Sequence, residues 1–257
     1  MAKKTGFREL SDHSVNIQLG CEHNCRYCWA RADAVDRYHR CTDGQWVTPV
    51  INQEKVDLPW RRKYKGVVAF PTCHDITDRN MSEYLCVLRK LLDAGNDVRI
   101  TTKASWPVIP VICEAYLDYK PRIHFTFTLG STNDNVLGFW EPGAPNYAAR
   151  LGCLEYAYFK GYRTSVICEP YLDGWAVQLY ESVKDYITEE FWLGKLNKFE
   201  KRVCLEGVTD EQMNRFVRPL KLLLGDDYVM EMVRALAGRP HVKFKESVQA
   251  VIDKSKK

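Results

Sequence analysis

The chain has 257 residues, of which 46% are hydrophobic, and a formal net charge of +4 at pH 7. These values predict a folded globule with a substantial core, and the charge is too small for a dedicated DNA-coating protein. No run of about 18 apolar residues and no apolar stretch after the basic start is present, so we expect neither a membrane span nor a secretory signal.

Strands and helices are expected to alternate from the beginning of the chain. Alternating apolar residues predict a first strand at 14–19, and good helix formers predict a helix at 29–40. A second strand is expected at 66–70, followed by a helix that Asp78 caps and that runs to about 94. The third strand is expected at 97–102, and the stretch at 41–65 is expected to be irregular.

The same alternation continues to the C-terminus. Strands are predicted at 122–129, 163–168 and 191–194, with helices at 106–118, 146–160 and 174–187. Two more helices, at about 209–223 and 227–237, and a short strand at 241–244 complete the chain.

This order of elements predicts the fold class. Six strand–helix units favour right-handed crossovers and a parallel sheet, so we expect an α/β fold, a partial (β/α)6 barrel of the TIM type. The core should cover about 14–200, with a small helical C-terminal extension at about 201–257, all within a single domain of 1–257. A flat doubly wound sheet is the alternative. In both architectures ligands bind at the C-terminal ends of the strands.

Three of the ten cysteines form the most informative motif. Cys21, Cys25 and Cys28 have C-x3-C-x2-C spacing directly after the first strand. Three thiolates on one loop can hold three irons of a four-iron cluster and leave the fourth iron without a protein ligand. The alternative is a structural zinc site, completed by His39 or Cys41, in a binding module rather than an enzyme. Without a secretory signal, the cysteines indicate a reducing, cytoplasmic compartment.

The cysteine loop resembles that of the radical S-adenosylmethionine (SAM) enzymes. Their hallmark is C-x3-C-x-aromatic-C, and Tyr27 is the aromatic residue here. Four more segments, at 101–105, 141–151, 169–174 and 191–197, look in order like motifs of the spore photoproduct lyase-like branch. The resemblance covers about 14–200. The sequence departs from that branch at 71–75, where it has Pro-Thr-Cys-His-Asp.

The resemblance implies a radical SAM enzyme. A [4Fe–4S] cluster on the three cysteines would bind SAM at its open iron and cleave it reductively. The product, a 5′-deoxyadenosyl radical, would abstract a hydrogen atom from the substrate. A lyase-like enzyme would act on a nucleic-acid base or nucleotide, and the alternative is modification of a peptide or small metabolite. The expected partners are an electron donor such as flavodoxin or ferredoxin and a nucleic acid or nucleotide substrate, with no membrane.

Several polar residues are candidates for binding SAM by the same resemblance. Lys103, just past the third strand, would bind the methionine carboxylate, unless it is an exposed loop lysine. Tyr27 would pack against the cluster or contact adenine, and Asn197 would contact adenine.

The fourth strand adds two threonines, and the loop after it adds a carboxylate. Thr126 and Thr128 lie on the face opposite the aromatic residues, where they would bind methionine or ribose, or else contact neighbouring helices. His124 shares that face and is expected to be a hydrogen-bonded core histidine. Glu141 would accept hydrogen bonds from ribose, or else form an ion pair with Arg150.

Cys73 is the one candidate for direct chemistry on the substrate. It follows the second strand, close to where the lyase-like branch places a thiol that returns a hydrogen atom to the product radical. The weak S–H bond makes a thiol a good hydrogen donor. The alternative is a small apolar residue in a tight turn.

Overall fold

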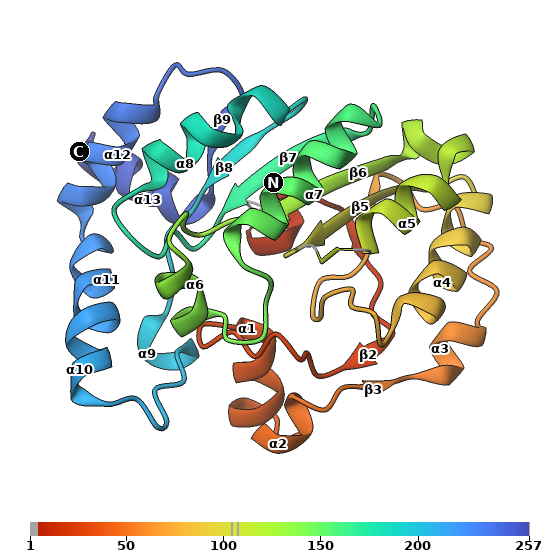
Figure 1. The fold of residues 1–257 in the computed structure, drawn as a ribbon, viewed down its shortest axis with the longest axis horizontal. Coiled ribbons are helices and arrows are strands. Elements are labelled where there is room, and N and C mark those ends of the chain that lie inside the picture. Colours follow the sequence, from red (N-terminus) through yellow and green to blue (C-terminus); the bar gives the residue numbers. More distant parts are fainter. Residues whose placement is uncertain (1–4, 104, 107, 257) are drawn as a thin grey trace.

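The computed structural model describes residues 5–103, 105–106 and 108–256. Its centre is a sheet of seven parallel strands (Figure 1). The strands, in spatial order, are β1 (His13–Ser14), β4 (Val67–Ala69), β5 (Asp97–Thr102), β6 (Ile123–Thr128), β7 (Arg163–Cys168), β8 (Phe191–Leu193) and β9 (Val242–Phe244). Within the described residues β1 and β9 are the two edges, so the barrel does not close. The predicted α/β partial barrel is confirmed.

Helices cover the outer face of the sheet (Figure 1). They are α4 (Met81–Asp93), α5 (Val108–Ala115), α7 (Tyr147–Phe159) and α8 (Ala176–Val183), with short turns η3 (Leu117–Arg122) and η4 (Lys184–Tyr186). In α4 the buried positions recur every three or four residues, which is the pattern of a helix packed on a sheet. The residue at the start of this helix is Asn80, not the predicted Asp78. The Asn80 side chain accepts a hydrogen bond from Thr77 N and so fixes the turn that leads into the helix.

The inner face of the sheet carries a buried polar layer. His124 Nε2 lies 2.8 Å from Ser165 Oγ, which donates to Glu190 at 3.1 Å. Arg99 donates to Glu190 and to Thr126 Oγ1, both at 3.4 Å. Burial and the charge of Arg99 lower the pKa of His124 to about 3, so its ring is neutral. His124 is therefore a hydrogen-bonded core residue, as the sequence predicts.

The first strand and the stretch after it differ from the prediction. Only β1 joins the main sheet; β2 (Gln18–Leu19) pairs antiparallel with β3 (Val50–Ile51). The stretch expected to be irregular also holds α2 (Asp43–Trp46) and α3 (Gln53–Asp57). The helix predicted at 29–40 is present as α1 (Trp29–Arg31) and the π-helical η2 (Ala32–Arg37), whereas α6 (Asp134–Trp140) was not predicted. The bounds of β2 and β3 depend on their pairing with each other across more than 30 residues, which local periodicity does not reveal.

The C-terminal part contributes to the sheet as well as to the helices. Its elements are α9 (Phe199–Arg202), α10 (Asp210–Gln212), η5 (Met213–Val217), α11 (Arg218–Leu223), α12 (Asp226–Leu236), β9 and α13 (Glu246–Ser255). The short strand predicted at 241–244 is the seventh strand. Lys245 is buried and pairs with Glu9 at 2.7 Å, which ties η1 (Gly6–Glu9) to the end of β9. Among the described helices, none has the length and apolar character needed to cross a membrane.

Candidate active site

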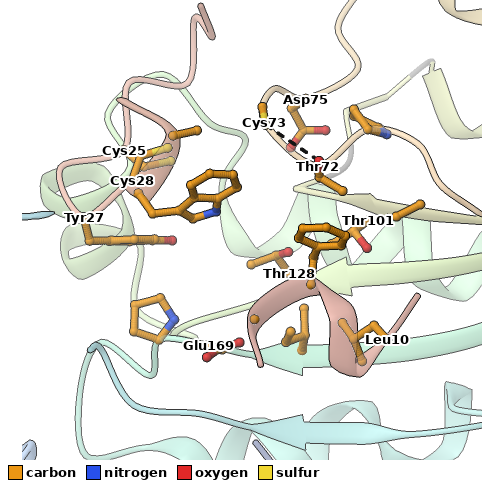
Figure 2. Close-up of a pocket in the computed structure, with 18 of the residues that line it drawn as sticks. Leu10, Cys25, Tyr27, Cys28, Thr72, Cys73, Asp75, Thr101, Thr128 and Glu169 are labelled. Atoms are coloured by element: carbon orange, nitrogen blue, oxygen red, sulfur yellow. Dashed lines mark hydrogen bonds between the residues drawn. The ribbon is translucent and has the colours of Figure 1, made fainter. Parts of the chain in front are cut away.

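A cavity of about 550 Å³ opens at the C-terminal ends of the strands (Figure 2). The last or penultimate residues of several strands line it, among them Ala69, Thr101, Thr128 and Ile167. The residues predicted from sequence that line it are Cys21, Cys25, Tyr27, Cys28, Cys73, Lys103, Thr128 and Asn197. The structure therefore brings the cysteine loop and most of the predicted binding residues to one site.

The cysteine loop is held by close backbone contacts on two sides. Cys21 N donates to Trp46 O at 2.8 Å. Gly20 has a φ of +91°, and a Cβ at this position would collide with the same carbonyl. On the other side, a Cβ on Gly143 would collide with the carbonyl of Glu22. These two glycines let the chain enclose the loop without a side chain between.

Tyr27, Glu141 and Arg150 form a buried group beside the cysteines. The Tyr27 hydroxyl donates to Glu141 Oε1, and Arg150 lies 2.5 Å from Glu141 Oε2. Burial would raise the pKa of Glu141, but the charges of Arg150 and Lys103 and the hydrogen bond from Tyr27 outweigh it and lower the pKa. The ion pair with Arg150, one of the two expectations, is present. Glu141 is not among the lining residues, and its contact with ribose stays a prediction.

Asp75, which the sequence did not single out, lines the cavity beside the cysteine loop. Its carboxylate accepts hydrogen bonds from Thr102 Oγ1 at 2.5 Å and Lys103 N at 2.7 Å, and it lies 3.3 Å from His23 Nδ1. Burial would raise the pKa of Asp75, yet His23, Lys103 and Thr102 together lower it. Asp75 thus joins the cysteine loop to the end of β5. Its position two residues after Cys73 was the available signal.

The remaining predicted binding residues lie at different depths. Lys103 is half-buried, with Nζ 5.8 Å from the centre of the Tyr27 ring. Burial would lower the pKa of Lys103, but Cys25, Glu141 and Asp75 raise it, so the ammonium stays charged. Thr128 and Asn197 reach the cavity. Thr126 is fully buried beneath it, where it accepts the hydrogen bond from Arg99.

Cys73 lies beside Thr72 and Asp75 at the cavity (Figure 2). It packs against the same small apolar cluster of Ala30, Ala34 and Trp46 as Cys21 and Cys28. Burial raises the pKa of Cys73, so the thiol keeps its proton at neutral pH. Of the two residues proposed for a zinc site, Cys41 also packs against this cluster and His39 is exposed.

The three motif cysteines have surroundings that favour the neutral thiol in the absence of a metal. Burial raises the pKa of Cys21 to about 12 and that of Cys25 well above its ordinary value, so both are neutral thiols unless a metal binds them. Throughout the part of the chain that the structure describes, no three His, Cys, Asp or Glu side chains converge on one position for a single ion. A four-iron cluster makes a different demand, because each thiolate binds its own iron.

Comparisons with known proteins show which fold this is. No protein-family model and no curated protein matches the chain. Among solved structures, one mutant of spore photoproduct lyase superimposes with a TM-score of 0.55 at 14% identity, over 95% of this chain and 79% of that one. A second mutant of the same enzyme gives 0.54 at 14% identity, over 91% and 76%.

A second neighbour is more distant. Streptococcus suis SuiB bound to S-adenosylmethionine gives a TM-score of 0.45 at 10% identity, over 70% of this chain. This chain spans only 39% of SuiB. The likeness to the lyase covers nearly the whole chain. The chain has the fold found in spore photoproduct lyase.

Proposed function

We propose that this protein is a radical SAM enzyme. One observation carries the proposal: the three cysteines of the C-x3-C-x2-C loop line a single cavity together with Lys103 and Thr128, at the C-terminal ends of parallel strands. This is where α/β folds of this kind bind their ligands. The lyase-like fold supports the same conclusion.

The residues present fit a [4Fe–4S] cluster and SAM. Cys21, Cys25 and Cys28 would hold the cluster, since thiolates are the ligands that iron–sulfur clusters use. Once bound, the two cofactors would supply a carbon-centred radical that takes a hydrogen atom from the substrate. The Lys103 ammonium would bind the SAM carboxylate, and Thr128 and Asn197 would bind its other polar groups.

Cys73 would complete the reaction by returning a hydrogen atom. In this step the S–H bond breaks, a C–H bond forms on the product radical, and an unpaired electron remains on sulfur. One electron and one proton then restore the thiol, and a one-electron donor of the flavodoxin or ferredoxin class would provide the electron. Such a donor also has to reduce the cluster, which makes it the expected partner in the cytoplasm.

The charge of the cavity lining favours an anionic substrate, such as a nucleotide or nucleic acid. Six Lys and Arg residues line it, against the two carboxylates of Asp75 and Glu169. Three of the six are paired with carboxylates: Arg99 with Glu190, Lys195 with Asp226, and Lys245 with Glu9 and Glu169. Among the described residues, Arg8, Lys103 and Arg202 have no such ion pair, against the single carboxylate of Asp75. This excess of positive charge attracts phosphates or carboxylates. The basic run at 61–65 does not line the cavity, so it lends the proposal no support.

Two measurements test the proposed activity. Protein purified without oxygen should be brown, absorb near ~400 nm and contain about four irons per chain, as expected for an iron–sulfur cluster. With dithionite and SAM it should release 5′-deoxyadenosine. A colourless protein that carries zinc would sink the proposal and favour the binding module.

A further inference from the structure

Asn16, between β1 and β2, holds the turn that carries Cys73. Its Oδ1 accepts hydrogen bonds from the backbone N–H groups of Thr72, at 2.8 Å, and Cys73, at 2.9 Å. Its Nδ2 donates to Thr72 Oγ1 at 2.8 Å. One side chain that lies 56 residues before the turn therefore makes three hydrogen bonds to it.

These contacts fix which end of the Asn16 amide is which. Backbone N–H groups can only donate, so the atom that faces both of them must be the amide oxygen. The other end is then the amino group, which can only donate. Thr72 Oγ1 therefore accepts a hydrogen bond from Asn16, and its own proton is directed elsewhere.

The sulfur of Cys73 is the available acceptor for that proton. It lies 3.7 Å from Thr72 Oγ1, and among the described residues the Thr72 hydroxyl has no other acceptor. If the hydroxyl donates to sulfur, the proton of the thiol is not engaged by Thr72. Within the same residues the Cys73 side chain makes no other hydrogen bond, and it lines the cavity.

We propose that Asn16 and Thr72 are positioning residues for Cys73: Asn16 fixes the Thr72 hydroxyl as a donor to sulfur and leaves the S–H bond free toward the cavity. The opposite polarity would engage the very hydrogen that has to be transferred. The role of the Cys73 thiol as a hydrogen-atom donor rests on the proposed function. The orientation of the Thr72 hydroxyl follows from the hydrogen bonds alone.

The orientation is tested by the reactivity of Cys73 toward iodoacetamide, in the anaerobically purified protein. Trypsin releases Cys73 in the peptide Gly66–Arg79, which has no other cysteine, so its alkylation is followed by mass spectrometry. Thr72→Val keeps the shape and removes the donor. A hydrogen bond to sulfur favours the thiolate, so its loss should slow alkylation about fivefold at a fixed pH below the thiol pKa.

Two further variants keep the test decisive. Thr72→Ser retains the hydroxyl and should react at the wild-type rate. Asn16→Asp keeps the oxygen that accepts the two N–H bonds but replaces the amino group by a second acceptor. The Thr72 proton should turn toward this acceptor, and Cys73 should again react more slowly. If Thr72→Val does not fold, the Asn16→Asp result decides.

The control is Cys86, an exposed cysteine on α4 that the same digest releases in the peptide Asn80–Arg89. Its alkylation rate should be equal in every variant. Faster or unchanged alkylation of Cys73 in Thr72→Val, with iron content intact, would overturn the orientation. A protein without iron that nevertheless shows the expected order of rates would instead contradict the proposed function and leave the orientation standing.

Discussion

The cavity has two walls that use their polar groups differently. On the loop wall, formed around the cysteine loop, the polar lining residues bind partners on or behind the wall. Tyr27 donates to the buried Glu141, which pairs with Arg150, and Asp75 contacts His23 and Thr102. The strand wall consists of residues at or after the ends of β5, β6 and β8: Thr101, Thr128, Asn197 and Arg202. Their side chains make no hydrogen bond or ion pair with another described residue.

This difference separates a scaffold from a binding surface. Polar groups that satisfy one another keep their geometry without a ligand, which suits a loop that must hold a cluster. Unpaired donors instead gain their partners when a ligand binds. Substitutions on the loop wall should therefore cost cluster or fold, and those on the strand wall should cost ligand affinity.

The largest effect is expected from Cys25→Ala on the loop wall. Loss of one thiolate should prevent assembly of the cluster, so iron, brown colour and 5′-deoxyadenosine release should all fall to background. The matched control is Cys86→Ala, which removes an exposed cysteine on α4 and should keep all three. Release of 5′-deoxyadenosine by Cys25→Ala would contradict the assignment of the ligands.

Glu141→Gln should damage the fold before it damages binding. It leaves the buried Arg150 guanidinium without its counter-charge, and removing one partner of a buried pair typically costs about 3–5 kcal/mol in the free energy of unfolding. Urea denaturation measures this. Glu114→Gln, which breaks an exposed pair with Lys160, should change the stability little. Equal stability of both variants would show that the loop wall is not pre-organised.

Lys103→Met should weaken SAM binding. The loss of a charge-assisted hydrogen bond to the carboxylate predicts a dissociation constant roughly 10- to 100-fold higher. Equilibrium dialysis with the cluster-loaded protein measures it. Lys63→Met, in the basic run outside the cavity, serves as the control. An unchanged affinity would remove Lys103 from the SAM site.

Thr128→Val and Thr126→Val give a sharper contrast, since the two residues share one face of β6. Thr128→Val should raise the SAM dissociation constant about fivefold, the value of one neutral hydrogen bond. Thr126→Val should leave SAM binding unchanged and lower the free energy of unfolding by about 1 kcal/mol, because Arg99 loses an acceptor. If Thr126→Val weakened SAM binding and Thr128→Val did not, Thr128 would not belong to the strand wall.

The smallest expected effect is on the pH dependence of stability, with opposite signs for two carboxylates. The pKa of Asp75 is lowered, so its stabilising contribution is present above its ordinary value of about 4 and is lost as the pH falls below that. Burial raises the pKa of Glu169, so its contribution is present below about 4 and is lost as the pH rises.

Unfolding in urea at several pH values measures both. The stability difference between wild type and Asp75→Asn should shrink on acidification below about pH 4. The free energy of unfolding of the wild type, relative to that of Glu169→Gln, should rise as the pH falls from about 7 to about 4. If both stability differences changed in the same direction with pH, the two carboxylates would have similar surroundings.

The sequence by itself determined the features that depend on local spacing. The bounds of β5 and β7 agree with the predicted strands at 97–102 and 163–168, since a short run rich in β-branched residues is typical of a single buried strand. The cysteine motif could also be recognised from local spacing alone, because three ligands on a short loop are close in space in any fold. The first strand was predicted too long, because its pairing depends on β4 and β3 rather than on its own residues.

Only the tertiary structure decided which polar residues face the cavity. Thr126 and Thr128 are indistinguishable in the sequence, and their depth in the barrel separates them: one meets Arg99 below, the other meets the cavity. Asn16 and Asp75 acquire their roles from partners that are 27 to 57 residues away. Such contacts are set by how the strands stack and curve, and a local pattern contains no information about that.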